Sequence, residues 1–595
     1  MHENAKTRKC PLSKVQNDDC VRPLSISIAG SCSQYSRNGS GETCWKMWLC
    51  VVSLFSVVCA DELLTRNLSL GPIHGKLITT PNGVESYAFQ GIPYAEPPIG
   101  DLRFKAPQFK KPWLGKVLET TSYRKNCIYN SSASPLAMPY DELSEDCLYM
   151  NVFTSKNCLE SKNCSVLFFI HGGAWKSEGP KMLKAETIVE NFLPEDRNIV
   201  VVTIAYRLGF LGMINLAPEI EGWDTLKNIG LHDQLVALQF VNREIHNFGG
   251  DPAKITLMGH SSGAVDAYSL YISPKTDNLI SQIIIMSSAY GDQENKPDTN
   301  TATCRKIAEY LNCAKEDTDY SYLAAVEKVL DCLENVPVET LVDAQRSIED
   351  TGLHLMRRAA DARGPDPIFP SGVSQLIKQS KALPMLVGTT GKELGFSYDL
   401  VKNGIVDVKL LEGACAFAIS DAMSDNMDEA RKHCVEHYGD PSRARFLLDD
   451  LYFFTSAYTS AEANYDRNPQ TYLYQFDYAD IGDAYYVKPG FTLPHDKEPY
   501  HGQELVYLLG LYQGNFTPKD VQIQKDWSQL IVSFINTGNP EFEAEPFHPG
   551  SGNYLSVDFD KNGKMTPAMK TGYHADAVNF WSQYKEKPEE CSWNG

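Results

Sequence analysis

The sequence predicts an α/β protein with one large, mostly parallel, doubly wound sheet that helices cover on both faces. Short apolar runs recur along the chain and alternate with longer segments of helical spacing. Continuous apolar runs are typical of strands that are buried on both faces. After Asp61, no linker, repeat or change of composition marks a boundary. Residues 61–595 are therefore predicted to form a single domain.

The expected strands are apolar or β-branched runs, and in chain order they cover 166–170, 199–206, 254–258, 282–287, 384–390 and 471–478. Between the second and third runs, apolar residues recur at helical spacing and give that segment one buried face: Leu231, Leu235, Leu238, Val241, Ile245 and Phe248. Strand–helix alternation of this kind is what a doubly wound sheet requires.

Composition and charge exclude several classes of function. The chain has 595 residues, a formal net charge of −20 and no long Lys/Arg run, so nucleic acid is not an expected partner. The acidity is expected to serve solubility. No metal-ligand spacing such as H-E-x-x-H occurs in the sequence, and neither a metal nor an organic cofactor is expected.

The segment Lys46–Glu62 has the order of a secretory signal. A lysine precedes an apolar stretch that is too short to span a bilayer comfortably, and Val58-Cys59-Ala60 follows as a cleavage site. We predict a signal peptide over 47–60 and a secreted chain from near Asp61, without a transmembrane anchor. Residues 1–46 are interpreted as a polar extension outside the fold, upstream of a start at Met47. The alternative is an internal signal behind a polar tail.

Two further features fit the secretory pathway. Sixteen cysteines is a high count for a reducing compartment. Asn-x-Ser/Thr sequons, which are predicted glycosylation sites, follow the proposed cleavage point at Asn67, Asn130, Asn163 and Asn515.

A candidate nucleophile lies in the run G-H-S-S-G. The predicted strand 254–258 ends before it and a helical pattern follows, so Gly259 to Gly263 must form a sharp turn. In such a turn the central Ser261 projects its Oγ above the sheet. The helix N-terminus directs free N–H groups at developing negative charge. Ser262 is then expected to supply a backbone N–H to an oxyanion hole, with a dispensable hydroxyl.

A base and an acid follow in the order Ser, acid, His. Glu393 comes after the strand 384–390, and His501 precedes a helical pattern. Gly172 and Gly173 follow the strand 166–170 and let backbone N–H groups approach a substrate closely. Each signal alone also fits a surface histidine, a solvated loop or a plain turn. Their combination in this order predicts a catalytic site.

Longer motifs carry a family resemblance, and in order they are FQGIPYAEPPIGDLRFKAPQ (89–108), SEDCLYMNVF (144–153), HGGAW (171–175), NIGLHDQLVAL (228–238), FGGDPAKITLMGHSSG (248–263) and HGQELVYLLG (501–510). With these motifs the sequence resembles the type-B carboxylesterases, in the carboxylesterase/cholinesterase branch of the α/β hydrolases, over roughly residues 68 to 585. The resemblance implies the α/β-hydrolase fold and hydrolysis of small-molecule esters. It implies a nucleophile, acid and base at Ser261, Glu393 and His501, and an oxyanion hole of Gly172, Gly173 and Ser262.

The sequence departs from the family pattern near these residues. His260 stands where the family usually has Glu, Leu394 stands where Gly usually follows the acid, and Ser288 stands where Gly is usual. By the resemblance, Ser287 aligns with a serine whose hydroxyl can hydrogen-bond the triad acid.

The first disulfide loop, 127–147, bears on the substrate. Cholinesterases carry a Trp there that binds choline by cation–π attraction, but this loop has none. Tyr129 and Tyr140 are weaker substitutes. Together with His260, this favours neutral esters over choline esters. A cholinesterase and a catalytically inactive adhesion or ligand-binding member remain the alternatives, although inactive members typically lack the serine.

The cysteines are assigned in part. By the resemblance, Cys127 pairs with Cys147 and Cys313 with Cys332. Cys158 and Cys164 are close enough in the sequence to pair locally, whereas the pairing of Cys304, Cys415 and Cys434 is open. Cys591 either joins two chains in a homodimer or is an untethered thiol near the chain end.

Overall fold

The computed structural model describes residues 64–132, 137–217, 220, 227–288, 299–353, 358, 361–362, 364–394, 400–422, 427–485 and 498–584. The predictions for the extension 1–46, for the signal peptide 47–60 and for Cys591 lie outside these residues.

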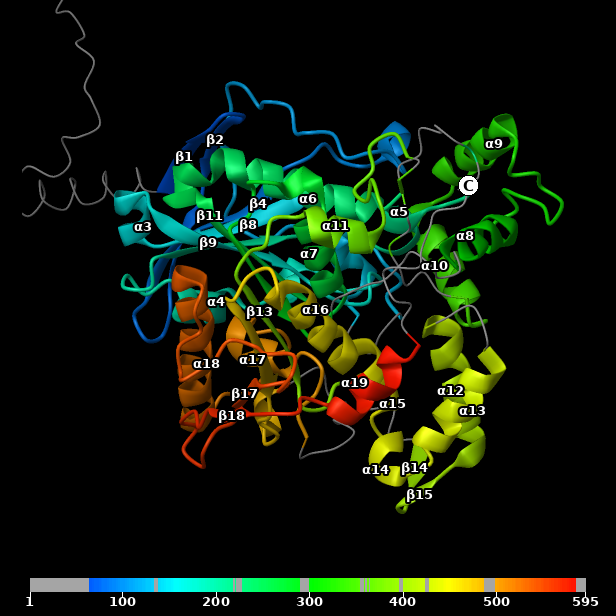
Figure 1. Cartoon of the computed structure of the whole chain (residues 1–595). Coiled ribbons are helices and arrows are strands. Elements are labelled where there is room, and N and C mark those ends of the chain that lie inside the picture. Colours follow the sequence, from blue (N-terminus) through cyan, green and yellow to red (C-terminus); the bar gives the residue numbers. More distant parts are fainter. Residues whose placement is uncertain are drawn as a thin grey trace, which may run out of the picture. The chain divides into compact units, whose positions relative to one another are not determined.

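Within the described residues, an eleven-stranded sheet has the order β18-β17-β16-β13-β12-β11-β9-β10-β8-β4-β3 (Figure 1). Its strands are β3 (Lys76–Thr79), β4 (Glu85–Pro93), β8 (Tyr149–Thr154), β9 (Cys164–Ile170), β10 (Ile199–Ile204), β11 (Gly250–His260), β12 (Gln282–Met286), β13 (Met385–Thr390), β16 (Thr471–Phe476), β17 (Tyr554–Val557) and β18 (Ala568–Lys570). The strands from β10 to β17 pair in parallel, and β8, β4, β3 and β18 add antiparallel edges. All six predicted strands are confirmed within this sheet.

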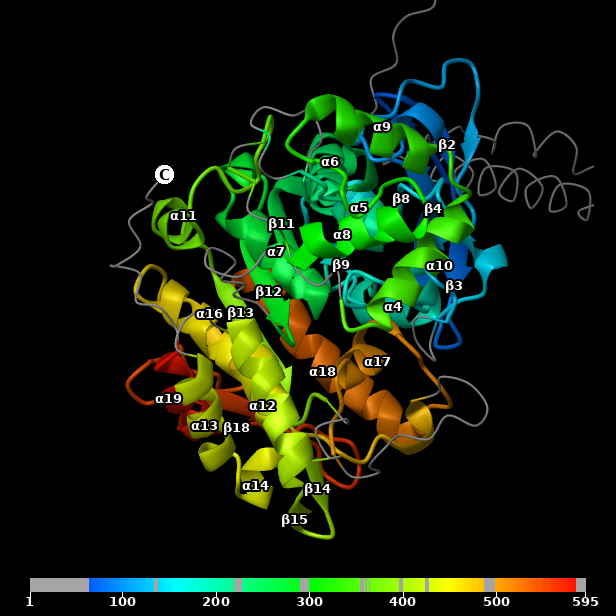
Figure 2. The ribbon, with the colours of Figure 1, turned by 90° about the vertical axis from the view of Figure 1, so that its right-hand side faces the viewer.

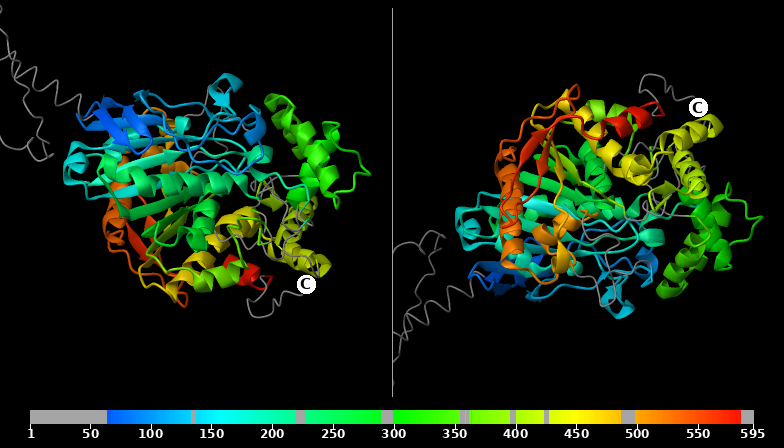
Figure 3. Two further views of the ribbon diagram at one scale, coloured as in Figure 1. Left: turned by 90° about the horizontal axis from the view of Figure 1, so that it is seen from above. Right: turned by 90° about the horizontal axis from the view of Figure 1, so that it is seen from below.

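Helices cover the sheet on both faces (Figure 1, Figure 3). In β9, Val166, Phe168 and Ile170 pack into one core with apolar residues of α6 (Ile229–Glu244), α7 (Ser262–Ile272) and α16 (Thr455–Tyr465). The alternate residues Leu167 and Phe169 pack into a second core with α4 (Ala185–Phe192), α17 (Gln503–Leu509) and α18 (Pro518–Thr537). Because both faces of β9 are buried, its sequence is apolar without alternation, as predicted.

A third apolar cluster joins helices outside the sheet. Helices α12 (Val408–Ala422) and α13 (Met427–His437) pack side by side (Figure 2), and α19 (Ala575–Ser582) contributes Phe580 and Trp581 to the same cluster. The cluster thus joins α12 and α13 to α19, which lies near the end of the described chain. It has no counterpart in the sequence-based prediction.

Further strands form small separate sheets, of order β1-β2-β5, β6-β7 and β14-β15, and further helices lie between the strands along the chain. They are β1 (Thr65–Leu68), β2 (Gly71–His74), β5 (Leu118–Glu119), β6 (Asn126–Cys127), β7 (Leu143–Ser144), β14 (Val401–Lys402), β15 (Ile405–Val406), α3 (Lys156–Ser161), α5 (Gly209–Met213), α8 (Thr299–Tyr310), α9 (Leu323–Glu334), α10 (Val338–Glu349), α11 (Val373–Gln379), α14 (Pro441–Ala444), α15 (Leu447–Asp449) and a π-helix (Asp450–Phe454). The predicted helix over 231–248 is α6 followed by a 3₁₀ turn (Ile245–Phe248).

The structure contains both disulfides that the resemblance implied, Cys127–Cys147 and Cys313–Cys332. It also pairs Cys158 with Cys164, and Cys415 of α12 with Cys434 of α13. Cys304 is buried and forms none of these bonds; its Sγ accepts a hydrogen bond from the Asn215 backbone N–H (3.4 Å).

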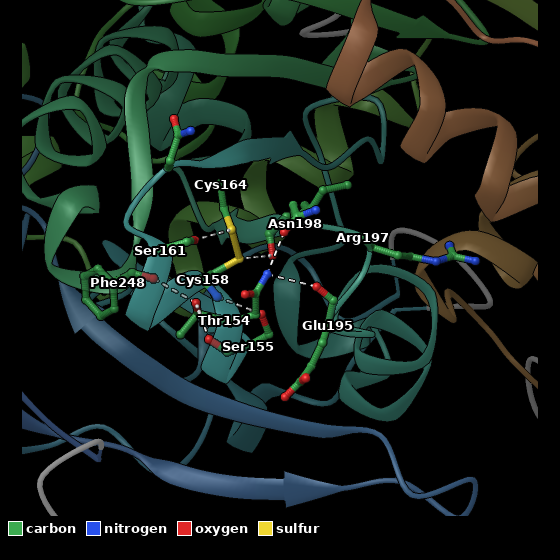
Figure 4. Close-up of a disulfide and its surroundings, with 12 residues drawn as sticks. Thr154, Ser155, Cys158, Ser161, Cys164, Glu195, Arg197, Asn198 and Phe248 are labelled. Carbon is green, nitrogen blue, oxygen red and sulfur yellow. Dashed lines mark hydrogen bonds between the residues drawn. A yellow bond between two sulfur atoms is a disulfide. The ribbon is translucent and has the colours of Figure 1, made fainter. Parts of the chain in front are cut away.

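The Cys158–Cys164 bond closes a small insertion ahead of β9 (Figure 4). The Ser155 Oγ caps α3 by accepting the N–H of Cys158 (3.2 Å), and the Cys164 N–H donates to the Gly249 carbonyl (3.1 Å). The Thr154 hydroxyl donates to the Phe248 carbonyl (2.8 Å). These contacts tie the end of β8 to the starts of β9 and β11.

Loop length predicts a ranking of these bonds. The separation is 6 residues for Cys158–Cys164 and 19 for Cys415–Cys434. Loop-closure entropy assigns about 2 kcal/mol to the first and about 3 kcal/mol to the second. We expect the double variant Cys415→Ser/Cys434→Ser to lose more free energy of unfolding than the double variant Cys158→Ser/Cys164→Ser. Urea unfolding provides the measurement. An equal or reversed loss would mean that local strain or packing dominates over loop closure.

Candidate active site

Ser261 lies on a strained turn between β11 and α7. Its backbone has φ 56° and ψ −126°, outside the conformations that a non-glycine residue usually adopts. Glycines permit the turn, because a Cβ at Gly259 would lie 2.0 Å from the Gly263 carbonyl oxygen. A Cβ at Gly263 would lie 2.4 Å from the carbonyl oxygen of Ile170 in β9. The turn and its neighbour strand are thus packed backbone to backbone, with Ser261 at the apex.

The three candidate triad residues meet at this turn. The Oγ of Ser261 lies 2.7 Å from Nε2 of His501, and Nδ1 of His501 lies 2.7 Å from Oε2 of Glu393. The second carboxylate oxygen of Glu393 accepts the backbone N–H of Thr390 (2.8 Å). His501 stands just before α17 and Glu393 just after β13, so residues far apart in the sequence form one continuous hydrogen-bonded chain.

The acid loop is held by a buried ion pair. Lys392 contacts the carboxylate of Asp449 at the end of α15, and both side chains are almost fully buried. The same carboxylate accepts the backbone N–H groups of Glu393 (3.2 Å) and Leu394 (2.9 Å). Leu394 is not in the left-handed region, so the glycine that is usual at this position in the family is not required here.

Acidic side chains set the basicity of His501. Burial alone would lower the pKa of the imidazole, but the hydrogen bond and charge of Glu393, with the charges of Glu504 and Glu178, outweigh it and raise the pKa above its usual value. A base with a raised pKa removes a serine proton more readily at neutral pH.

His260 packs against the base on the side of Ser261. Its ring centroid lies 4.6 Å from that of His501, and the ring of Phe453 approaches His501 from the π-helix at 4.9 Å. Burial and the neighbouring His501 hold the pKa of His260 well below its usual value, so this ring is neutral. Neither of its ring nitrogens has a hydrogen-bond partner among the described residues. His260 therefore brings an uncharged ring to a position where the family usually has a carboxylate.

Ser287 differs from the expected contact. We expect its hydroxyl to reach the triad acid, but it donates to Oε1 of Glu504 (3.1 Å). Burial and the charge of Glu393 raise the pKa of Glu504 to about 8. Sequence reasoning missed Glu504, and its place three residues after His501 was the available signal.

Glu178 is a second acidic residue that the sequence did not single out. It follows the glycine-rich turn after β9 at φ 74°, and its carboxylate accepts a hydrogen bond from the hydroxyl of Tyr512 (3.1 Å). Burial raises its pKa to about 7. Its charge acts on His501, so it belongs to the electrostatic surroundings of the candidate base.

The expected oxyanion residues lie against the nucleophile. A Cβ at Gly172 would come within 2.9 Å of the Cβ of Ser261, which places this backbone directly beside the nucleophile. Gly173 adopts φ 87°, and Ser262 is the first residue of α7. We expect the Ser262 hydroxyl to be dispensable, but in the structure it accepts the backbone N–H of Trp175 (3.2 Å) and so ties α7 to this turn.

The loop residues named for choline recognition are engaged elsewhere. Tyr129 is buried and its hydroxyl accepts the Met138 N–H (3.0 Å), whereas the hydroxyl of Tyr140 donates to Asp343 of α10 (2.5 Å). The sequon residue Asn130 donates to the same Asp343 (2.7 Å). The other sequon residues are exposed, and these are Asn67, Asn163 and Asn515.

Among the residues that the structure describes, no group of three or more His, Cys, Asp or Glu side chains is arranged to hold a metal ion. No helix in this part of the chain is long and apolar enough to cross a membrane.

The chain is similar to known proteins over most of its length. A family model described as "Carboxylesterase family" matches residues 62–581. The para-nitrobenzyl esterase of Bacillus subtilis is 29% identical over 481 residues, covering 78% of this chain and 89% of that protein. Gut esterase 1 of Caenorhabditis briggsae is 28% identical over 550 residues, covering 84% and 90%.

Among solved structures, a PNB esterase superposes with a TM-score of 0.68 at 25% identity, covering 87% of this chain and 99% of the other. The juvenile hormone esterase of Manduca sexta has a TM-score of 0.72 at 22% identity and covers 88% and 99%, which is a likeness of fold.

The charges around His501 predict a pH dependence. The base must be neutral to act, so kcat/KM is fully present above the pKa of His501 and falls as the pH drops through it. In Glu178→Gln a nearby negative charge is lost, and the pKa of His501 falls. Because Glu178 has a pKa of about 7 and is itself partly protonated across this limb, we expect the acid limb to move to lower pH by only a few tenths of a pH unit, measured with a nitrophenyl ester. Glu119→Gln is the control, because this side chain is exposed. If the acid limb of Glu178→Gln does not move, Glu178 does not influence the pKa of His501.

Proposed function

The chain belongs to the carboxylesterase family and is a carboxylic-ester hydrolase, and on that premise we propose that Ser261, His501 and Glu393 carry out the reaction on neutral esters. The observation that supports this assignment most directly is the unbroken chain of two 2.7 Å contacts from Ser261 through His501 to Glu393. A nucleophile, a base and an orienting acid need this arrangement.

The proposed reaction has two steps. His501, oriented by Glu393, accepts the proton of Ser261 as Oγ attacks the ester carbonyl carbon. The resulting tetrahedral intermediate collapses, the bond to the alcohol oxygen breaks, and His501 returns the proton to the leaving alcohol. Water then loses a proton to His501 as its oxygen attacks the acyl carbon. The bond from that carbon to Oγ breaks, the acid is released, and His501 returns the proton to Ser261.

Backbone N–H groups of Gly172, Gly173 and Ser262 are proposed to stabilise the oxyanion in both steps. Gly172 is packed against Ser261, and Ser262 begins α7, so its N–H lies at a helix N-terminus where negative charge is favoured. The strain at Ser261 supports the same role, since strained backbone concentrates at catalytic sites.

The preference for neutral esters rests on what surrounds the site. The loop 127–147 contains no Trp to face a quaternary ammonium, and the side chain of Tyr129 is buried. His260 is neutral where the family usually places a carboxylate. These features remove two sources of attraction for choline.

The disulfides are compatible with an extracellular location. We propose that the chain is secreted through a signal peptide at 47–60, is glycosylated at the four sequons and has Cys591 as a candidate link in a homodimer. Sequencing of the secreted N-terminus tests the cleavage site, and a start far from Asp61 rejects it.

The catalytic assignment predicts a pattern of activity across esters. We expect turnover of nitrophenyl esters with a graded series of acyl chains, and a lower kcat/KM for acetylthiocholine. Ser261→Ala should lose at least about a thousandfold in kcat, because the nucleophile is removed. Steady-state kinetics on the secreted protein provide the measurement.

Two results would contradict this assignment. Absence of both burst and turnover with every ester would support an inactive ligand-binding member. A preference for acetylthiocholine over matched neutral esters would support a cholinesterase.

A further inference from the structure

The turn that follows β9 is held in conformations that need support. Ala174 has φ 52° and Trp175 has φ 57°, both in the left-handed region without being glycine. These two residues directly follow Gly172 and Gly173, which are the proposed oxyanion donors. A strained segment of this kind persists only where surrounding contacts fix it.

Trp175 supplies those contacts through three polar groups. Its backbone N–H donates to the Ser262 hydroxyl (3.2 Å), and its carbonyl accepts the N–H of Gly209 (2.7 Å). Its indole Nε1–H donates to Oδ1 of Asp266 (2.9 Å). Since the side chain is buried, these bonds are shielded from water and fix both the backbone and the ring.

Asp266 is itself locked in place. It lies on α7, one turn after Ser262, and it is fully buried. Arg358 binds both of its carboxylate oxygens, with Nε to Oδ1 at 2.6 Å, and Gln234 of α6 donates to Oδ2 (2.5 Å). A bidentate Arg–carboxylate pair has a defined geometry and is stronger than a single contact.

The guanidinium of Arg358 also faces the indole. Its central carbon lies 5.4 Å from the Trp175 ring centroid, within the range of a cation–π interaction. Trp175 is therefore held on its edge by the carboxylate and on its face by the guanidinium of the same ion pair. The ion pair connects the turn after β9 to the helix that begins beside the nucleophile.

We propose that Trp175 is a positioning residue that holds the backbone N–H groups of Gly172 and Gly173 in register with Ser261, with Asp266, Arg358 and the Ser262 hydroxyl as its clamp. The inference rests on the proposed function, because it gives these N–H groups an oxyanion to bind. It adds three buried side chains and one hydroxyl to the residues on which turnover depends.

This role affects kcat rather than KM. The oxyanion exists in the transition state and the tetrahedral intermediate, whereas the bound ester still has a neutral carbonyl. Loss of positioning therefore slows turnover and weakens tetrahedral analogues, with little effect on ground-state binding.

Trp175→Phe tests the proposal, because it removes the indole N–H and keeps an aromatic face for Arg358. We expect kcat per titrated active site to fall about tenfold to a hundredfold while KM changes less than about threefold. The inhibition constant of a trifluoromethyl ketone, which adds to serine to form a tetrahedral oxyanion, should rise by the same factor as kcat/KM falls.

The matched control is Trp113→Phe. The Trp113 indole also donates one hydrogen bond, to the Pro72 carbonyl (3.0 Å), and lies outside the proposed machinery, so kcat and KM should stay at the wild-type values. Ser262→Ala is a second, smaller change that removes the other side of the clamp. We expect it to lower kcat about threefold to tenfold with KM unchanged, which tests the proposal even if Trp175→Phe does not fold.

The possible failures can be told apart. Wild-type protein that hydrolyses no ester would overturn the proposed function itself. An active wild-type enzyme whose Trp175→Phe and Ser262→Ala variants keep kcat within twofold, or lose activity through KM alone, would overturn only the positioning role.

Discussion

The close approach of the β11–α7 turn to the end of β9 is the constraint on which the site depends. A Cβ at Gly259 would collide with the carbonyl oxygen of Gly263, and a Cβ at Gly263 would collide with the carbonyl oxygen of Ile170 in β9. This contact places the apex residue Ser261 beside Gly172. It also brings the first residue of α7 next to the turn that contains Trp175. The nucleophile, the proposed oxyanion donors and the contacts of Trp175 thus all depend on the same close approach between the β11–α7 turn and the end of β9.

The charged side chains around His501 are arranged differently from the family pattern. The residue before the nucleophile is a buried neutral imidazole instead of the usual carboxylate. Negative charge reaches the base from Glu393 and from Glu178 on the opposite turn, while Glu504 has a pKa raised to about 8. Two buried carboxyls close together cannot both ionise without cost, which is why the charge of Glu393 adds to burial in raising the pKa of Glu504.

The sequence predicted the centre of the fold better than its margins. The parallel strands β9, β10, β11, β12, β13 and β16 are largely β-branched and apolar runs, because both of their faces are covered, and this pattern is readable without a structure. The antiparallel edge strands β3 and β18 are short and partly exposed, so their residues carry little signal. The α12–α13 pair was not anticipated, since its burial depends on contacts with α19 more than a hundred residues away in the sequence.

The sequence by itself determined the elements of the site that local chemistry requires. The glycines around Ser261, the glycine pair after β9, and the order of serine, acid and histidine follow from what a sharp turn and a proton relay need. Only the tertiary structure decided which side chains support them. The partners of Ser262, Ser287 and Trp175 are a backbone N–H, a carboxyl and a buried ion pair from distant segments. Such contacts leave no periodic trace in the chain, because hydrogen-bond partners are chosen by proximity after folding and not by spacing along the sequence.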